Sequence, residues 1–198
     1  MAARDPTGNT AVRSVVLVSG AAGRLGLAVC EDLARDHDVL ALYRSSVPAI
    51  ASQLQWPIVD SERGVRAVHC IQGDLTKRKD LRRVVEVGLA RFGQIDAVVN
   101  CVADIRFHGR LLELTDHVDN VVGQLRVNAI APVLLVSEIF QSHWKHCPED
   151  NSARNRSVVN VSSISGHLVG EPQGQGYYAA SKAALDILSM YQALELAP

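Results

Sequence analysis

Residues that could move a proton to or from an oxygen stand close together near the end of the chain. Tyr178 and Lys182 are four residues apart in the run YAASK, so on a helix their side chains share one face. An ammonium beside a phenol favours the phenolate, which suits a phenol to acid–base work near neutral pH. Upstream, Ser162, Ser163 and Ser165 follow an apolar run, and a hydroxyl there can donate to a carbonyl oxygen. The pattern favours proton transfer at a carbonyl or alcohol; the structural alternative is that the serines only cap a strand end.

A glycine-rich turn near the N-terminus has the spacing of a phosphate-binding loop. In SGAAGRLG, Gly20 can make a tight turn, Gly23 allows backbone to approach a ligand, and Gly26 allows a helix to pack closely on a strand. Free N–H groups at the start of the following helix, together with its dipole, favour a pyrophosphate. We therefore expect nucleotide binding rather than a purely structural turn, with Arg24 and Leu25 among the contacts.

The end of the second predicted strand indicates which dinucleotide is bound. NAD sites usually place Asp or Glu there to bond the ribose 2′-OH, whereas this strand ends in the residues YRSS, at 43–46. Arg44, with Ser45 beside it, and Arg24 from the glycine turn can pair with a 2′-phosphate through their planar guanidinium groups. We expect NADP(H); the alternative is that both arginines are solvated surface residues.

Short apolar runs alternate with helical periodicity along the chain, and these elements must position the residues above. We expect strands at 14–18, 39–43, 65–72, 95–99 and 157–161, helices at 25–33, 81–92 (closed by Gly93), 118–140 (interrupted by Pro132) and 177–196, a helix plus loop within 45–64, and a polar loop at 149–156. Nearly continuous apolar strands predict a parallel sheet covered by helices. Right-handed crossovers then give an α/β, doubly wound fold of Rossmann type, with its ligand site at the carboxyl ends of the strands.

Length and composition favour one enzyme-sized domain over residues 1–198, with 1–12 flexible. A net charge of −1 without a basic block argues against nucleic acid or an anionic membrane as partner. We find no apolar run approaching a membrane span and no signal-peptide core. The four cysteines are Cys30, Cys70, Cys101 and Cys147, and none forms a CxxC pair. We therefore expect them to be small buried hydrophobic residues and expect no metal site. A reduced, cytoplasmic protein fits this pattern.

In this order and spacing, the motifs resemble those of the short-chain dehydrogenase/reductase (SDR) family. We expect its simple, non-extended branch, although the spacing of Gly20, Gly23 and Gly26 matches the variant commoner in the extended branch and does not by itself settle the choice. The glycine turn is similar to the TGxxGxxG fingerprint, with Ser19 in place of the usual Thr. The run NCVA at 100–103 resembles the family's NNAG, with the second Asn and the Gly changed. Ser163 is followed, as in the family, by two residues and then Gly166. The resemblance extends from about Val15 to Pro198.

The resemblance implies hydride transfer between a nicotinamide and a small carbonyl or alcohol substrate. Tyr178 would be the acid/base, Ser163 would polarise the substrate oxygen, and Lys182 would bind the nicotinamide ribose and tune Tyr178. Asn128, within a predicted helix, would complete a water-mediated proton relay; the alternative is a polar contact between helices. Further implied cofactor contacts are Asp74, Leu75, Asn100 and Ala103. Asp74 also fits as the N-cap of the next helix.

The resemblance also implies what the chain leaves out and how it assembles. Relatives continue beyond the point matching Pro198 through further strands and a substrate-covering helix, so we expect the C-terminal substrate-loop region to be absent. An alternative function is therefore a non-catalytic NADP(H)-binding protein or an inactive fragment. A nucleotide-sugar epimerase or dehydratase is a third, against which the lack of a second domain speaks. The two long helices predict a homo-oligomer, and the sequence does not indicate the substrate.

Overall fold

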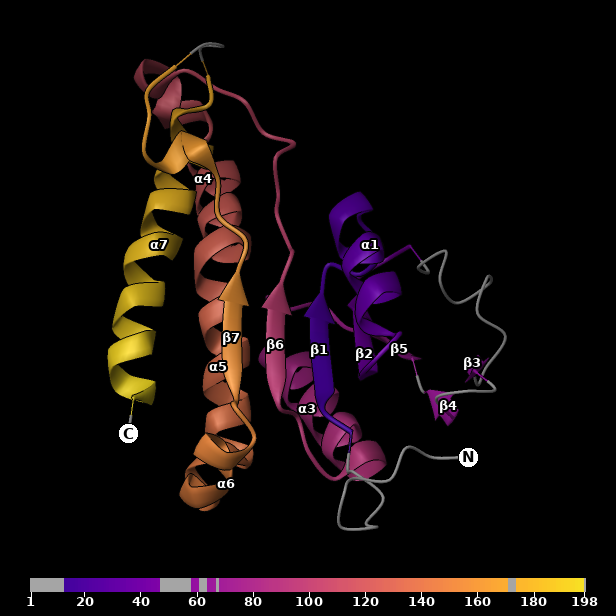
Figure 1. The fold of residues 1–198 in the computed structure, drawn as a ribbon. Coiled ribbons are helices and arrows are strands. Elements are labelled where there is room, and N and C mark those ends of the chain that lie inside the picture. Colours follow the sequence, from indigo (N-terminus) through magenta and orange to yellow (C-terminus); the bar gives the residue numbers. More distant parts are fainter. Residues whose placement is uncertain (1–12, 47–57, 61–63, 67, 171–173, 198) are drawn as a thin grey trace.

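Five parallel strands form the central sheet of the computed structural model, which describes residues 13–46, 58–60, 64–66, 68–170 and 174–197. In spatial order the strands are β5 (Val68–Gln72), β2 (Asp38–Tyr43), β1 (Val15–Ser19), β6 (Ala97–Asn100) and β7 (Ser157–Asn160) (Figure 1). The strand order reverses between β1 and β6, and such a switch point is where doubly wound sheets bind ligands. The predicted α/β fold is thus confirmed.

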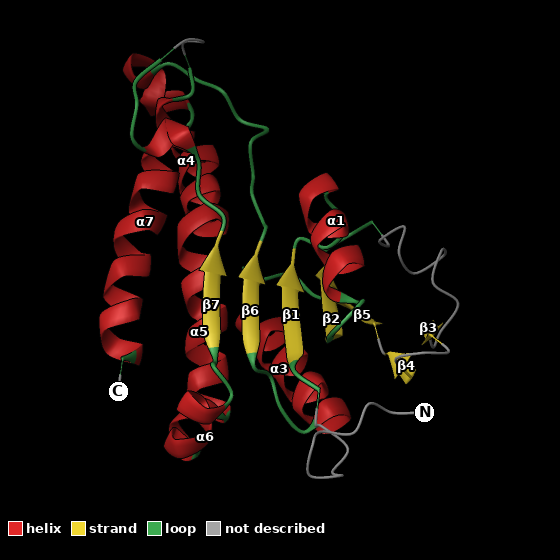
Figure 2. Cartoon of the chain, viewed as in Figure 1, coloured by secondary structure: helices red, strands yellow, loops and turns green. Residues whose placement is uncertain are grey.

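Helices cover both faces of the sheet, because successive strand residues point to opposite sides. Leu17 of β1 joins a core with α3 (Arg78–Phe92) and α5 (Ala131–Ser142), whereas its neighbours Val16 and Val18 join a second core with α1 (Arg24–Leu33). The long α7 (Gly176–Leu196) packs beside α4 (Val118–Leu125) and α5, next to the edge strand β7 (Figure 2). Gly93 closes α3 with φ 75°, as predicted.

The long helical stretch from Val118 changes its hydrogen-bond register before Pro132. A π-helical turn, η2 (Arg126–Ile130), separates α4 from α5, and Pro132 lies in the first turn of α5. A proline fits there because its missing N–H falls at a helix start. By length and composition Val118–His146 could cross a membrane, contrary to our expectation that no segment approaches that length. Its inner face, however, packs into the core on the sheet, so we assign it as a core helix.

Two stretches differ from the sequence-based expectation. The predicted polar loop at 149–156 contains a short helix, α6 (Pro148–Ala153). A proline followed by two acidic residues favours a helix N-terminus, and this outweighed the polar composition. The strand predicted to begin at Val65 begins in the main sheet at Val68, because β4 (Gly64–Arg66) pairs antiparallel with β3 (Ile58–Asp60) instead. The helix expected within 45–64 falls largely outside the described residues.

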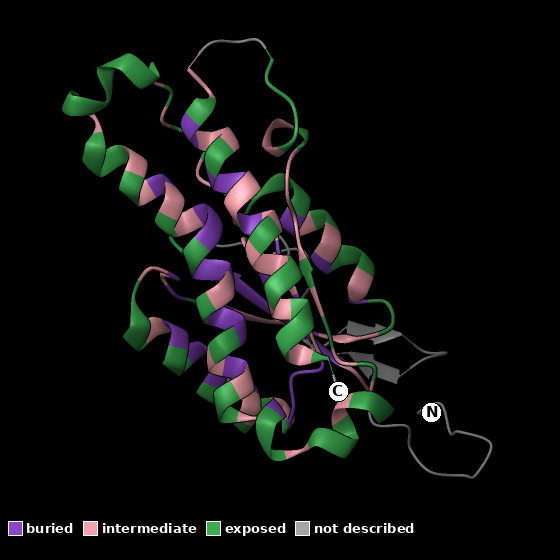
Figure 3. Ribbon diagram, turned by 90° about the vertical axis from the view of Figure 1, so that its left-hand side faces the viewer, coloured by how far each residue is buried: buried purple, intermediate pink, exposed green. Residues whose placement is uncertain are grey.

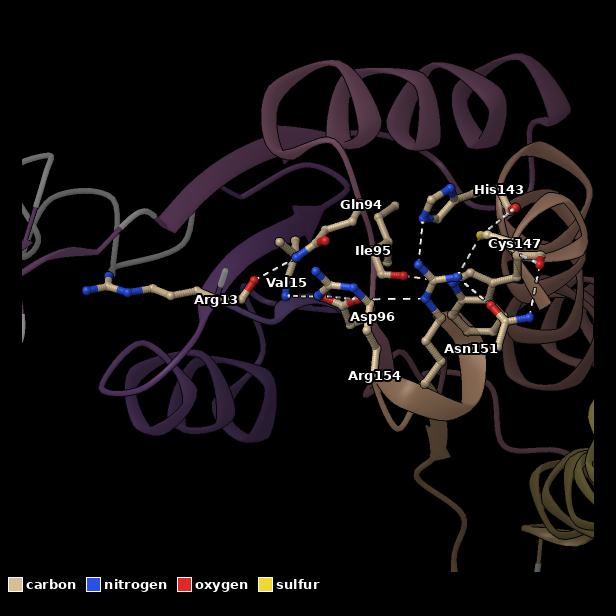
Figure 4. Close-up of polar contacts among 11 residues, drawn as sticks. Arg13, Val15, Gln94, Ile95, Asp96, His143, Cys147, Asn151 and Arg154 are labelled. Carbon is tan, nitrogen blue, oxygen red and sulfur yellow. Dashed lines mark hydrogen bonds and ion pairs between the residues drawn. The ribbon is translucent and has the colours of Figure 1, made fainter. Parts of the chain in front are cut away.

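A buried ion cluster joins the amino ends of β1 and β6 to the segment before β7 (Figure 4). The Asp96 carboxylate accepts the Val15 N–H at 2.8 Å and lies 3.4 Å from Arg154 and 3.7 Å from Arg156. Asp96 and the Arg156 side chain are each only 3% exposed. Arg156 also donates to the sulfur of Cys147 at 2.9 Å. The cluster is far along the strands from their carboxyl ends, so we assign it to stability.

We predict that Asp96→Asn lowers the free energy of unfolding by about 3–5 kcal/mol, because it leaves a buried guanidinium without its counter-charge. Urea denaturation measures this. The matched control is Asp32→Asn on α1, where an exposed carboxylate pairs with Arg35 at 3.1 Å; we expect a change below about 0.5 kcal/mol there. Equal effects of the two substitutions would contradict the assignment.

Candidate active site

The glycine turn after β1 has the close contacts that its sequence predicts. Gly20 has φ +74°, and a Cβ there would lie 2.9 Å from the Val102 nitrogen. A Cβ on Gly26 would lie 2.2 Å from the Gly20 carbonyl oxygen, so only glycine lets α1 approach the turn. Gly23 is the N-cap of α1 and no side chain caps the helix. The N–H groups of the first helical turn are therefore available to an anion.

A cavity of about 340 Å³ opens next to this turn, at the carboxyl ends of β1, β2, β5 and β6. Of the predicted cofactor contacts, six line it: Gly20, Arg44, Ser45, Asp74, Leu75 and Ala103. Six others do not line it: Arg24, Leu25 and Gly26 in the first turn of α1, Asn100 at the end of β6, and Tyr178 and Lys182 on α7. The cavity thus gathers half of the predicted cofactor contacts, all of them from the segments that follow β1, β2, β5 and β6.

The cavity has a second arginine that the sequence analysis missed. Arg106 lines it together with Arg44 and holds Asp104 through two hydrogen bonds, Nε–Oδ1 at 3.0 Å and Nη2–Oδ2 at 2.6 Å. Hydrogen bonds from Arg106 are the main cause of a lowered Asp104 pKa, and the charge of Arg44 contributes. Arg106 lies in the loop after NCVA, and no sequence motif marked it.

Asp74 does not cap the following helix, so this prediction is wrong. Lys77 is the N-cap of α3. The Asp74 carboxylate instead accepts the N–H of Thr76 at 3.0 Å and its hydroxyl at 2.7 Å, closing a local turn. Asp and Asn favour such a bond two residues on, and it competes with helix capping. The turn keeps Asp74 and Leu75 at the cavity wall.

Asn100 has a structural contact where the sequence predicted a cofactor contact. Its side chain accepts from the Ser19 hydroxyl at 2.9 Å and donates to Asn160 at 2.8 Å. Asn160 in turn donates to Ser189 of α7 at 2.8 Å. Asn100 is 1% exposed, so its amide is committed to a chain of bonds across β1, β6, β7 and α7. No local pattern in the sequence indicated that Asn160 would be its partner.

Asn128 links the loop after β6 to the start of α7. Lying in the π-helical turn and fully buried, it accepts from the N–H of Asp104 and donates to that residue's carbonyl at 2.9 Å. It also lies 3.0 Å from the Ser181 hydroxyl, which donates to the carbonyl of Tyr178 at 2.7 Å. The predicted contact between helices is present, and its role in a proton relay stays a prediction.

Ser163 lies where a short helix meets α7. It is the N-cap of η4 (Ile164–Gly166), and its Oγ accepts the N–H of Ser165 at 3.2 Å, which leaves the hydroxyl proton free to be donated elsewhere. A Cβ on Gly166 would lie 3.0 Å from the Ala183 nitrogen, so η4 packs directly on the backbone of α7. This close packing holds Ser163 beside the helix that carries Tyr178 and Lys182.

Lys182 is buried between α7 and the sheet, with 2% of its surface exposed. Its Nζ donates to the carbonyl of Val161, just after β7, at 2.7 Å. Burial is the main cause of a lowered Lys182 pKa. Lys182 also lies close enough to influence Cys101, which lines the cavity. The Lys182 ammonium therefore lies between the backbone of α7 and the nucleotide end of the site.

One cysteine, Cys30, is buried as predicted, and the other three are partly buried. Burial raises the pKa of Cys30 to about 12 and raises those of Cys70 and Cys101. All four cysteines are unpaired, as expected. Within the described part of the chain, no group of three or more His, Cys, Asp or Glu side chains is arranged to hold a metal ion.

Comparison with known proteins agrees with this geometry. The sequence model of a family described as short chain dehydrogenase matches residues 14–198. An uncharacterized NAD-dependent oxidoreductase of Mycobacterium tuberculosis is 32% identical over 198 residues, covering 92% of this chain and 66% of the relative. The farnesol dehydrogenase of Aedes aegypti is 26% identical over 183 residues, covering 88% of this chain and 67% of the relative.

A solved structure supports the fold. The short-chain dehydrogenase/reductase of Serratia marcescens superimposes with a TM-score of 0.73 at 23% identity, covering 92% of this chain and 68% of that one. The chain thus spans about two thirds of the length of the proteins it matches.

Proposed function

Since the chain belongs to the short-chain dehydrogenase family, we propose that it is an NADP(H)-dependent oxidoreductase of small carbonyl or alcohol compounds. The observation that supports the proposal is that η4, whose N-cap is Ser163, packs directly on α7, the helix that carries Tyr178 and Lys182. The family supports hydride transfer in general. The choice of NADP(H) and the roles of individual residues are our proposal.

The residues at the strand ends fit a dinucleotide. The glycine turn leaves no room for a Cβ at Gly20 or Gly26, and the uncapped start of α1 offers N–H groups to a pyrophosphate. Asp74 and Leu75 line the wall where an adenosine would lie. The nicotinamide would supply or accept the hydride when bound; the protein binds it and handles the proton.

Four residues of this chain would divide the proton chemistry. Ser163, whose hydroxyl proton is free, donates a hydrogen bond to the substrate oxygen. Tyr178 gives that oxygen its proton in reduction and removes it in oxidation. Lys182, a buried side chain one helical turn from Tyr178, would bind the nicotinamide ribose. Asn128 positions α7 by its bonds to Asp104 and Ser181.

We predict that Tyr178→Phe lowers kcat for carbonyl reduction by about 10²–10⁴-fold, because it removes the proton donor. NADPH affinity should stay within about twofold, since the phenyl ring remains and only the hydroxyl is lost. Steady-state assays on a panel of aldehydes and ketones, with a fluorescence titration of NADPH, measure both. Tyr191→Phe, on an exposed part of α7, is the matched control and should leave kcat unchanged. Full activity of Tyr178→Phe would exclude the proposed mechanism.

The preference for a 2′-phosphate rests on Arg44. β2 ends at Tyr43 without an acidic residue in the positions that follow it, and Arg44 lines the cavity with its charge near Asp74 and Asp104. Arg106 adds a second guanidinium at the same cavity. The M. tuberculosis relative is named NAD-dependent. The NADP(H) preference that we propose for the present chain therefore differs from the cofactor in that name, and a binding experiment tests it.

We predict that Arg44→Ala weakens NADPH binding by about 10- to 100-fold, the loss expected for one hydrogen bond between charged groups. NADH binding should change by less than about threefold. Fluorescence titrations with both dinucleotides measure this, and Arg35→Ala, an exposed arginine just after α1, is the control. Equal affinity of the native chain for NADPH and NADH would contradict the preference.

Exposed apolar side chains on two helices support the proposed homo-oligomer. One row lies along α4, η2 and α5 and the other along the outer side of α7: Val118, Val122, Ile130 and Leu134, and Ile187, Met190, Tyr191 and Leu194. Figure 3 shows exposed residues along the helices on this side of the molecule. Covering such rows in a second copy removes apolar surface from water. Sedimentation velocity should give a dimer or tetramer; a monomer at micromolar concentration would contradict the proposal.

A further inference from the structure

A second cavity, of about 540 Å³, lies beyond the nucleotide end, beside the first turn of α7. Two groups of described residues form its walls: the loop after β6 with the start of η1 (Leu111–Asp116), and residues of 164–170 together with residues of 174–179. Its apolar lining consists largely of exposed aliphatic side chains: Leu111, Leu112, Ile164, Leu168 and Val169.

The two walls are tied to each other and to α7. The N–H of Gly109 donates to the carbonyl of Gly174 at 3.1 Å, joining one wall to the other. The Tyr177 hydroxyl donates to the carbonyl of Arg110 at 3.1 Å. The ring of Phe107 stacks on that of Tyr177 at 5.9 Å between centroids. These contacts fix the position of the cavity relative to α7. Tyr178 directly follows Tyr177 on that helix.

The cavity adjoins the proposed reactive groups. Ile164 and Ser165 line it and immediately follow Ser163, and the Ser165 N–H donates to the Ser163 hydroxyl oxygen. Ala179 lines it and immediately follows Tyr178. A molecule whose oxygen is bound by Ser163 and Tyr178 therefore has this cavity as the neighbouring space for the rest of its body.

The chemistry of the walls selects against charge. Among the described lining residues the one charged side chain is Arg110, and its guanidinium lies 3.8 Å from the Glu113 carboxylate. Leu112 is 91% exposed and Val169 is fully exposed. Such side chains at a cavity mouth gain by covering one another or a ligand, at about 0.8 kcal/mol for each buried CH₂. Arg110 is the one cation that these described walls offer an incoming carboxylate, and the Glu113 carboxylate already lies beside it.

From this lining we infer that the substrate carries an uncharged hydrocarbon body, as an aliphatic ketone, aldehyde or secondary alcohol does, with the chain in the cavity and the oxygen at Ser163 and Tyr178. The inference rests on the proposed oxidoreductase function. Within that function it assigns specificity to Leu111, Leu112, Ile164, Leu168 and Val169, none of which a sequence motif marked.

The test is a series of 2-alkanones from butanone to decanone, reduced with NADPH by the purified chain. Burial of each added methylene in the cavity should raise kcat/KM about fourfold until the cavity is filled, which is 0.8 kcal/mol converted at 1.36 kcal/mol per tenfold. A keto acid of the same length as decanone, ending in a carboxylate, should react at least tenfold more slowly than decanone. A flat series, or preference for the keto acid, would overturn the inference.

Matched variants locate the effect. Leu112→Asp introduces a charge at the cavity wall, whereas Leu114→Asp introduces one on the same short helix, outside the lining. Both leucines are exposed, so both variants should fold. We expect Leu112→Asp to lower kcat/KM for decanone at least tenfold with NADPH affinity unchanged, and Leu114→Asp to stay within twofold of the native chain. Equal effects of the two substitutions would overturn the inference.

A binding measurement separates failure of this inference from failure of the proposed function. If the native chain binds NADPH but turns over no carbonyl, the oxidoreductase proposal fails for this chain. Calorimetric titration of decanone into the NADPH complex then still decides the cavity's chemistry. Decanone binding that Leu112→Asp abolishes and Leu114→Asp retains would support the hydrocarbon site, and absence of binding by the native chain would overturn it.

Discussion

Four side chains form a continuous hydrogen-bonded chain across the carboxyl ends of the strands, and the site depends on it. Ser19 of β1 donates to Asn100 of β6, Asn100 donates to Asn160 of β7, and Asn160 donates to Ser189 of α7. Each amide in this chain both accepts and donates, so removing one member would leave buried polar groups unpaired, at about 1–3 kcal/mol each. These hydrogen bonds fix α7 against the strand ends, where the loops that line the 340 Å³ cavity begin.

A second set of hydrogen bonds, nearer the N-terminal end of α7, couples that helix to the loop after β6, which borders both cavities. The Asn128 side chain accepts a hydrogen bond from the Asp104 N–H and donates one to the Asp104 carbonyl. The same side chain contacts Ser181 on α7. Asp104 in turn holds Arg106 at the nucleotide cavity. Because the π-helical turn places Asn128 facing inward, one residue sets the loop's distance from the helix. A π-turn at a functional position is a recurrent use of that geometry.

Local patterns predicted most of the fold but not the partners of single polar residues. The apolar runs and the glycine turn predicted the sheet, α1 and the YAASK helix, since periodicity and backbone constraints act within a short segment. The pairing of Asn100 with Asn160 depends on two strands 60 residues apart, and no local signal encodes it. Asp74 closes a turn, Arg106 lines the cavity, and Pro148 starts α6; each outcome was decided by competition between two local options or by tertiary contact.

The placement of Lys182 shows how function opposes stability at this site. Its side chain is almost fully buried, and its ammonium donates a hydrogen bond to the Val161 carbonyl. Burial lowers its pKa below the unfolded value, so the charged form favours unfolding. This cost is complete at pH values below the folded pKa and disappears as the pH rises from the folded pKa to the unfolded value of about 10.4. An apolar residue would pack there without that cost, so the proposed contact of Lys182 with a bound ribose explains the lysine better than any contribution to the stability of the fold.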